Sequence, residues 1–198
     1  MSFIELVKNR RSIRKYKPNA VPDKVINELL EAARLAPSGC NAQPWKYVVI
    51  KDRNTINELV EQHIYHQNFV RHVPLLIVGC ADATAYEANK SGIEAQINDG
   101  TQPEGVDEYM RKVFRGQELT RAERDLAVSM TYMHLQAVAI GLGTCPVGRG
   151  SFDRERLHSF LDLPLDIEPL LSLAVGYAAE SPQPRPRKPL KEIIYRTI

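Results

Sequence analysis

The chain has 198 residues, of which 43% are hydrophobic and 25% are charged, and its formal net charge is +2 at pH 7. This composition excludes disordered and fibrous proteins, and the length favours a single domain over residues 1–198. The longest apolar runs fall far short of the roughly 20 residues that a membrane helix needs, and the N-terminus lacks the pattern of a secretory signal. We therefore expect a cytoplasmic protein with no membrane partner.

The first predicted element is a short amphipathic helix over residues 2–9, which leads into a basic segment, Lys8 to Lys17. Six of these ten residues are Lys or Arg, although the whole chain is nearly neutral. In an extended segment, Arg10, Ser12 and Arg14 project to one side and present two guanidinium groups with a hydroxyl between them. That arrangement suits phosphate, but a solvated basic surface is also compatible with it.

Helices and strands are then predicted in alternation. A second helix begins with Pro22 at its first helical position and ends at Pro37–Gly39. Its predicted buried face consists of Val25, Ile26, Leu29, Leu30, Ala33 and Leu35. Strands are predicted over residues 46–51, 75–80, 144–147 and 170–177, helices over 55–64 and 153–161, and an extended tail beyond residue 181.

Residues 81–119 are more polar than their surroundings, and we interpret them as an inserted, lid-like excursion with weakly helical pieces over 87–97 and 106–114. A capping box over Thr120–Glu123 predicts the start of a long helix that runs to about residue 140. Because this helix is apolar on most sides, we expect partner surfaces to bury it in two layers at the centre of the core.

The spacing of the cysteines and histidines predicts neither a disulfide scaffold nor a metal site. Cys40, Cys80 and Cys145 are widely spaced and odd in number, which is typical of a reducing compartment rather than a disulfide scaffold. The histidine spacing does not indicate a metal site, so we expect no metal. Cys145 is interpreted as a small packed residue.

Four segments have residues that packing alone does not explain. They are the basic segment, Pro37–Trp45, Gly143–Gly148 and Pro184–Leu190. In this order they resemble the FMN-dependent nitroreductase superfamily. Its members open with Arg-x-Ser-x-Arg or Lys, continue with Pro-Ser-x-x-Asn-x-Gln-Pro-Trp, carry a Gly-Leu-Gly turn and end with basic residues near a proline. The resemblance implies an α+β, nitroreductase-like fold with a central mixed or antiparallel sheet flanked by helices, a long buried central helix, and a homodimer with FMN at its interface.

The resemblance also implies a role for each motif residue. The FMN phosphate and ribityl chain are expected to bind Arg10, Arg11, Ser12, Arg14, Arg185 and Arg187. The loop that reaches the flavin from the facing subunit is expected to use Pro37, Ser38, Gly39, Asn41 and Gln43. The isoalloxazine is expected to lie along Pro146, Val147 and Gly148. No side chain is expected to be catalytic, because bound FMN carries the chemistry.

The implied reaction is ping-pong hydride transfer from NAD(P)H through FMN to a nitroaromatic, a quinone or a related small acceptor. The excursion is expected to cover the flavin and to present Tyr86, Tyr109, Met110 or Phe114 to the substrate. Two alternatives remain open. Pro37–Gly39 and Arg187–Leu190 are similar to the iodotyrosine deiodinase branch, which reductively dehalogenates halotyrosines, and a non-catalytic FMN-binding sensor would carry the same motifs. A nucleic-acid-binding module is disfavoured by the balanced charge and the 7% aromatic content.

Overall fold

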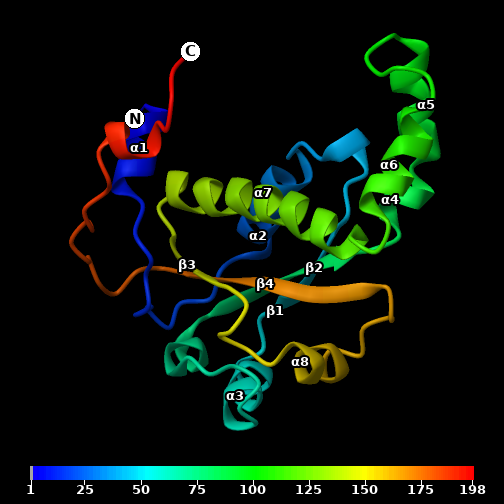
Figure 1. The fold of residues 1–198 in the computed structure, drawn as a ribbon. Helices are drawn as coiled ribbons and strands as arrows, with labels where there is room; N and C mark the ends of the chain where they lie inside the picture. The colour runs from blue at the N-terminus through cyan, green and yellow to red at the C-terminus, as the bar shows by residue number, and fades with distance from the viewer. Residues whose placement is uncertain (1) are drawn as a thin grey trace.

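The computed structural model describes residues 2–198, and its centre is one antiparallel sheet covered by helices on both faces (Figure 1). The strand order is β1 (Trp45–Ile50), β2 (Leu75–Asp82), β4 (Ile167–Gly176) and β3 (Gly143–Val147). All three strand pairs are antiparallel. The α+β architecture is the predicted one, and the sheet is antiparallel rather than mixed.

Helices occupy both faces of this sheet. The helices of the described residues are α1 (Phe3–Asn9), α2 (Asp23–Arg34), α3 (Arg53–Glu61), α4 (Ala85–Ala88), α5 (Lys90–Asn98), α6 (Val106–Phe114), α7 (Glu118–Ala139), α8 (Arg154–Phe160) and α9 (Leu190–Ile193), with short 3-10 turns η1 (Gly39–Asn41) and η2 (Asn68–His72). Figure 1 shows α2 and α7 on one face and α3 and α8 on the other. Among residues 2–198, no helix combines the length and the apolar character that spanning a membrane requires.

The continuous apolar run of β2 is explained by burial on both faces of the sheet. Leu75 and Ile77 belong to the core cluster beneath α2 and α7, whereas Leu76 and Val78 belong to the cluster beneath α3 and α8. Successive side chains of a strand point to opposite faces, so a strand covered on both sides needs apolar residues at every position. The central strand is therefore apolar throughout, not alternating.

The long helix α7 packs on the sheet through one stripe of buried side chains. Leu126, Met130 and Met133 are buried against the strands. Between them, the Ser129 hydroxyl donates to the Ala33 carbonyl at 2.6 Å and lies 2.6 Å from the hydroxyl of Tyr47 on β1. This hydroxyl ties α7 to both α2 and β1 inside an apolar core.

Three expectations about these helices are wrong in detail. The helix α7 begins at Glu118 after an N-cap, Gln117, that makes no side-chain capping bond, so Thr120 lies inside the helix and the capping box does not form. Pro22 occupies the N-cap of α2, one position before the helix. Leu35, predicted to be buried, is 62% exposed. The helix α2 ends at Arg34, and Leu35 is the C-cap residue that follows it.

The predicted burial of α7 in two layers is met on only part of its surface. The sheet and α2 cover one side, but Val128 and Tyr132 are 38% and 44% exposed. The excursion is also shorter than predicted, because β2 extends to Asp82 and α7 starts at Glu118. One chain therefore leaves an apolar face of its central helix uncovered.

Two glycines allow close approach in the core, and their replacement tests the packing. A Cβ on Gly176 would lie 2.4 Å from Cγ of Pro74, a rigid ring, whereas a Cβ on Gly79 would lie 2.9 Å from the flexible Met130 thioether. We expect Gly176→Ala to lower the free energy of unfolding by about 1–3 kcal/mol, and Gly79→Ala to lower it less. Urea denaturation of the two variants measures the difference, and equal losses would contradict this account.

Candidate functional site

The basic segment is threaded between the sheet edge and the chain that follows β4. The Ile13 amide donates to the Thr144 carbonyl of β3 at 2.8 Å, and Ser12 pairs with Thr144 in a parallel bridge. On its other side, the Ala179 amide donates to the Lys15 carbonyl at 2.9 Å. These bonds place the basic side chains beside the end of β3 and the start of the C-terminal tail.

A cavity of about 500 Å³ opens where the basic segment and the tail meet. Its walls come from the end of α1, the basic segment and the residues after β4. They are Val7, Lys8, Arg10, Arg11, Ser12, Arg14, Glu180, Pro182, Gln183, Pro184, Arg185 and Arg187. The structure thus brings together the residues predicted to bind phosphate from the two ends of the chain.

The charges in this cavity have distinct roles. Glu180 accepts hydrogen bonds from the backbone amides of Arg14 at 2.5 Å and Lys15 at 3.1 Å, so its carboxylate holds the basic segment in place. The Arg11 guanidinium donates to the carbonyls of Lys8 at 2.6 Å and Pro182 at 3.0 Å, which ties α1 to the tail. Arg11 therefore fixes the cavity wall by binding the backbone carbonyls of α1 and the tail.

Buried polar atoms near the cavity are left unsatisfied among the described residues. Thr144 Oγ1 and His134 Nε2 are buried without a hydrogen-bond partner. Burial and, to a smaller extent, the nearby Arg10 charge lower the pKa of His134 to about 4, so the imidazole is neutral at pH 7. The cavity is lined by five arginines, the Ser12 hydroxyl and a carboxylate, Glu180, that is bonded to backbone amides, and this donor set fits an anionic, oxygen-rich ligand such as a phosphate ester.

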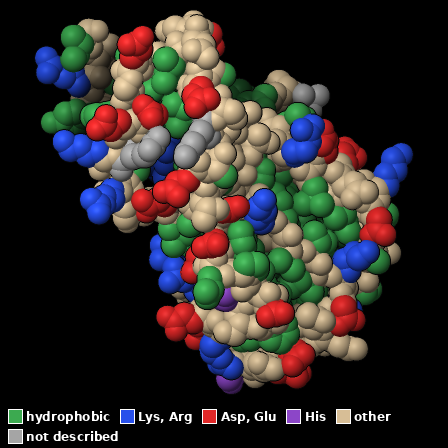
Figure 2. All heavy atoms as spheres, turned by 90° about the vertical axis from the view of Figure 1, so that its right-hand side faces the viewer, with side chains coloured by type: hydrophobic (Ala, Val, Ile, Leu, Met, Phe, Trp, Pro, Cys, Tyr) green, Lys and Arg blue, Asp and Glu red, His purple; other side chains and the backbone are tan. Residues whose placement is uncertain are grey.

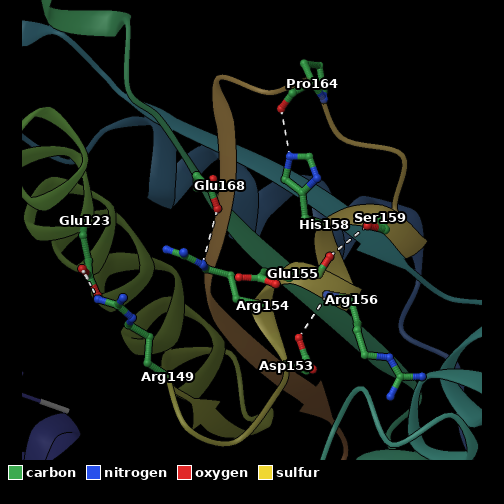
Figure 3. Close-up of polar contacts among 10 residues, drawn as sticks. All are labelled: Glu123, Arg149, Asp153, Arg154, Glu155, Arg156, His158, Ser159, Pro164 and Glu168. Carbon is green, nitrogen blue, oxygen red and sulfur yellow. Dashed lines mark hydrogen bonds and ion pairs between the residues drawn. The ribbon is translucent and has the colours of Figure 1, made fainter.

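The turn after β3 is held from two sides. The Arg149 guanidinium donates to Glu123 of α7 at 3.2 Å (Figure 3). On the other side, the Gln67 side chain donates to the Ser151 hydroxyl at 2.7 Å. The same picture shows the beginning of α8, where Asp153 accepts from the Arg156 amide at 3.1 Å. The end of β3, with Pro146 and Val147, and the turn that begins at Gly148 are thus anchored to α7 and to the segment before η2.

The residues of this turn differ in what they expose. Pro146 is exposed, whereas the Val147 side chain is buried in the core, so only its backbone can face a ligand. A Cβ added to Gly148 would meet open space. Cys145 is buried, as predicted for a small packed residue, and burial raises the pKa of its thiol.

The loop of Pro37–Pro44 lies away from the cavity in the same chain. Figure 1 shows η1 beside the excursion, while α1 and the tail lie near the opposite end of α7. Cys40, Asn41 and Gln43 adopt positive φ angles of 52°, 54° and 49°. The Gln43 amide donates to the Ser38 hydroxyl at 2.9 Å, which closes this strained loop. One chain does not bring the loop residues to the arginines.

The excursion projects from the body of the molecule, with charged side chains across its outer surface (Figure 2). Of the residues predicted to meet a substrate, Tyr109 on α6 is 63% exposed, and Met110 is half-buried. The Phe114 ring packs 4.7 Å from the Arg121 guanidinium. Tyr86 is buried with its hydroxyl 2.6 Å from Asp125, which argues against our expectation that it contacts a substrate. Within one chain, the excursion does not cover the cavity.

Some site residues were not found from the sequence. The Phe69 ring of η2 lies 5.9 Å from the Arg14 guanidinium and so forms part of the surroundings of the basic segment. Glu180, His134 and Asp125 were missed as well, because each looks like an ordinary polar residue of its segment. Their roles depend on partners that are distant in the sequence.

The sequence profile of the Nitroreductase family matches residues 7–177. The chain belongs to the nitroreductase family. The match covers the basic segment, the loop of Pro37–Pro44 and the turn after β3, and it ends where β4 ends. The predicted family is confirmed.

Individual nitroreductase-family proteins agree with this assignment. The chain is 34% identical over 192 residues to an NADH dehydrogenase of Thermus thermophilus, spanning 93% of this chain and 91% of that protein. It is 24% identical to an FMN reductase [NAD(P)H] of Bacillus subtilis, over 96% of this chain and 71% of that protein. The solved structure of a nitroreductase-like protein from Streptococcus mutans superposes with a TM-score of 0.82 at 25% identity, covering 99% of this chain and 98% of that one.

A local similarity runs to another branch of the superfamily. Over 63 residues the chain is 43% identical to iodotyrosine deiodinase 1 of Rattus norvegicus, a match that covers 30% of this chain and 22% of that protein. The predicted resemblance to the deiodinase branch is therefore confirmed over a limited part of the chain.

The neutral, buried His134 makes stability depend on pH. The unfolded imidazole binds a proton near pH 6.5, whereas the folded one does so only near pH 4. Stability is therefore lost as the pH falls through this window, by about 3 kcal/mol at its lower end. We expect the free energy of unfolding to fall from pH 7 to pH 4, and to fall more steeply in the wild type than in His134→Gln. Both proteins are measured without bound ligand. Parallel curves for the two proteins would contradict the assignment.

Proposed function

We propose that the protein is an FMN-dependent NAD(P)H oxidoreductase that reduces a small acceptor such as a nitroaromatic or a quinone. The observation that carries the proposal is the cavity in which Arg10, Ser12 and Arg14 meet Arg185 and Arg187. Family membership and the name of the Bacillus subtilis relative, FMN reductase [NAD(P)H], support the same cofactor and reductant.

The phosphate of FMN suits this cavity on electrostatic grounds. A phosphate monoester carries roughly two negative charges near neutral pH, and arginine forks bind its oxygens with charge-assisted hydrogen bonds. In this proposal, Arg10, Ser12 and Arg14 bind the phosphate from the N-terminal side and Arg185 and Arg187 close on it from the tail. Arg11 keeps the tail in reach through its bond to the Pro182 carbonyl.

The ring of FMN would lie along the end of β3 and the turn that follows it, where Pro146 is exposed and a Cβ on Gly148 would meet open space. Bound FMN supplies hydride transfer, accepting a hydride from NAD(P)H and passing electrons to the acceptor. The chain itself binds and orients the cofactor, so no catalytic side chain is required. The open space at Gly148 allows a flat ring to approach the backbone closely.

A homodimer completes the proposed site. The exposed apolar face of α7, with Val128 and Tyr132, is accompanied by exposed apolar side chains on α1 and the tail, namely Phe3, Ile4, Val7, Leu190, Ile193, Ile194, Tyr195 and Ile198. An area of this kind is typical of a subunit interface. In a second copy packed on α7, the loop of Pro37–Gln43 and the excursion would lie near this chain's cavity, and Tyr109 and Met110 would face the substrate there.

The dimer is tested by a charge placed on the uncovered face. We expect the protein to sediment at twice the 22.4 kDa mass of the chain, and Val128→Glu to shift it toward the monomer and weaken FMN binding, because a carboxylate would be buried at the interface. Leu165→Glu is the control, since Leu165 is 91% exposed in the turn before β4. A wild-type protein that sediments as a monomer would refute the homodimer.

Cofactor binding is tested by colour and by two arginine variants. The purified protein should be yellow and should bleach when NADH or NADPH is added without oxygen. Arg10→Gln and Arg14→Gln should each raise the Kd for FMN about 10-fold to 100-fold, the range expected when a charge-assisted hydrogen bond is lost. Arg34→Gln, which breaks an exposed ion pair with Glu31, should leave the Kd unchanged. Yellow protein that does not bleach would support a sensor, and colourless protein would refute the proposal.

A second candidate, reductive dehalogenation of a halotyrosine, rests on the 43% local identity to iodotyrosine deiodinase 1. The two candidates differ only in the acceptor. Stopped-flow mixing of the reduced protein with a nitroaromatic, a quinone and iodotyrosine distinguishes them. Fast reoxidation by iodotyrosine with release of iodide would favour the dehalogenase.

A further inference from the structure

A partly buried polar cluster joins the excursion, α7 and the loop of Pro37–Pro44. Its centre is Asp125 of α7, whose Oδ2 atom accepts from the Tyr86 hydroxyl at 2.6 Å and from the Gly39 amide at 2.7 Å. Tyr86 is only 8% exposed at the base of the excursion. We propose that Asp125 and Tyr86 are positioning residues that hold this loop in the conformation that binds flavin and couple it to the excursion. The inference rests on the proposed function and deepens it.

A guanidinium strengthens the same junction. Arg121, one turn before Asp125, is 8% exposed, and its guanidinium carbon lies 3.7 Å from the ring centroid of Tyr86 and 4.7 Å from that of Phe114. Its Nη2 atom is 3.6 Å from Cys40 Sγ in the loop. Cation–π contacts of a desolvated arginine are among the stronger ones of their kind. Arg121 therefore connects α4, α6 and the loop at one point on α7.

The next helix of the excursion also touches the loop. The Asn89 side-chain amide donates to the Cys40 carbonyl. A Cβ on Gly92 of α5 would lie 2.7 Å from that carbonyl oxygen, so the glycine is what permits this approach. The excursion thus contacts the loop backbone directly, in addition to its contacts through Asp125 and Arg121.

The loop needs this support because its backbone is strained. Cys40, Asn41 and Gln43 all lie in the left-handed region, which costs free energy in a residue other than glycine. The charged hydrogen bond to Gly39 and the amide bond to Cys40 offset that cost. Burial and the Asp125 carboxylate both raise the pKa of Tyr86, so its hydroxyl stays protonated and remains a donor.

The arrangement has a mechanical consequence. Any displacement of the excursion moves Tyr86 and Asn89, and each is bonded to a group that fixes the loop. Contacts made by the exposed residues of α6 with a substrate therefore change the loop's hold on the flavin. Cofactor affinity and acceptor KM should respond together when the cluster is broken.

The experiment compares Tyr86→Phe and Asp125→Asn with Tyr47→Phe. Tyr47 is a matched control, because its partly buried hydroxyl also lies 2.6 Å from a side chain of α7, but that side chain is Ser129 and not Asp125. We expect the two cluster variants to raise the Kd for FMN about tenfold and the acceptor KM severalfold with kcat changed less than twofold. Tyr47→Phe should lower the melting temperature by a similar amount and leave both constants within twofold of the wild type.

A second measurement separates this inference from the proposed function. Amide hydrogen exchange of residues 37–44, measured without FMN, should be faster in both cluster variants than in the wild type and in Tyr47→Phe. Unchanged exchange, or an unchanged Kd for FMN in stable variants, overturns the inference and leaves the oxidoreductase intact. A wild-type protein that binds no FMN overturns the function, while the exchange data still decide whether Asp125 holds the loop. Tyr86→Phe, which keeps the ring over Arg121, carries the test where Asp125→Asn does not fold.

Discussion

The packing of α7 on the sheet is the constraint on which the rest of the structure depends. Gly79 lets the helix approach β2 closely. The Ser129 hydroxyl donates to the Ala33 carbonyl and is hydrogen-bonded to the Tyr47 hydroxyl, so these contacts define the position of the helix on the sheet. Two acidic residues near its N-terminal end then hold separate loops: Asp125 binds the loop that contains Gly39, and Glu123 binds the turn that contains Arg149. A shift of α7 would therefore displace both.

The two ends of α7 serve different purposes. Near its C-terminal end, α1, the basic segment and the tail form an arginine-rich cavity whose one described carboxylate, Glu180, is bonded to backbone amides. Near its N-terminal end, the excursion and the strained loop form a single unit. In the proposed dimer, anchoring of the cofactor phosphate belongs to one chain and the choice of substrate to its partner. This proposal gives the arginines little influence on which acceptor is reduced.

Much of the fold followed from local patterns. The alternation of β-branched strands with amphipathic helices located β1, β2, β3 and β4 within a few residues, because periodic burial leaves a periodic sequence. The capping box at Thr120 failed because a pattern of four residues does not exclude an earlier helix start at Glu118. The burial of Tyr86 was not predicted for a different reason: its hydroxyl is bonded to Asp125, which lies 39 residues away in the sequence.

The sequence by itself determined the family, the basic segment and the order of the four motifs, since these depend on residue types and spacing along the chain. Only the tertiary structure decided which arginine shapes the cavity and which ones line it, because that depends on where Arg11 finds the Pro182 carbonyl. It also decided that the loop of Pro37–Pro44 is bonded to the excursion and lies away from the cavity of its own chain. Contacts between residues far apart in sequence arise from packing, and packing leaves no periodic signal at Asp125, Gly39 or Glu180.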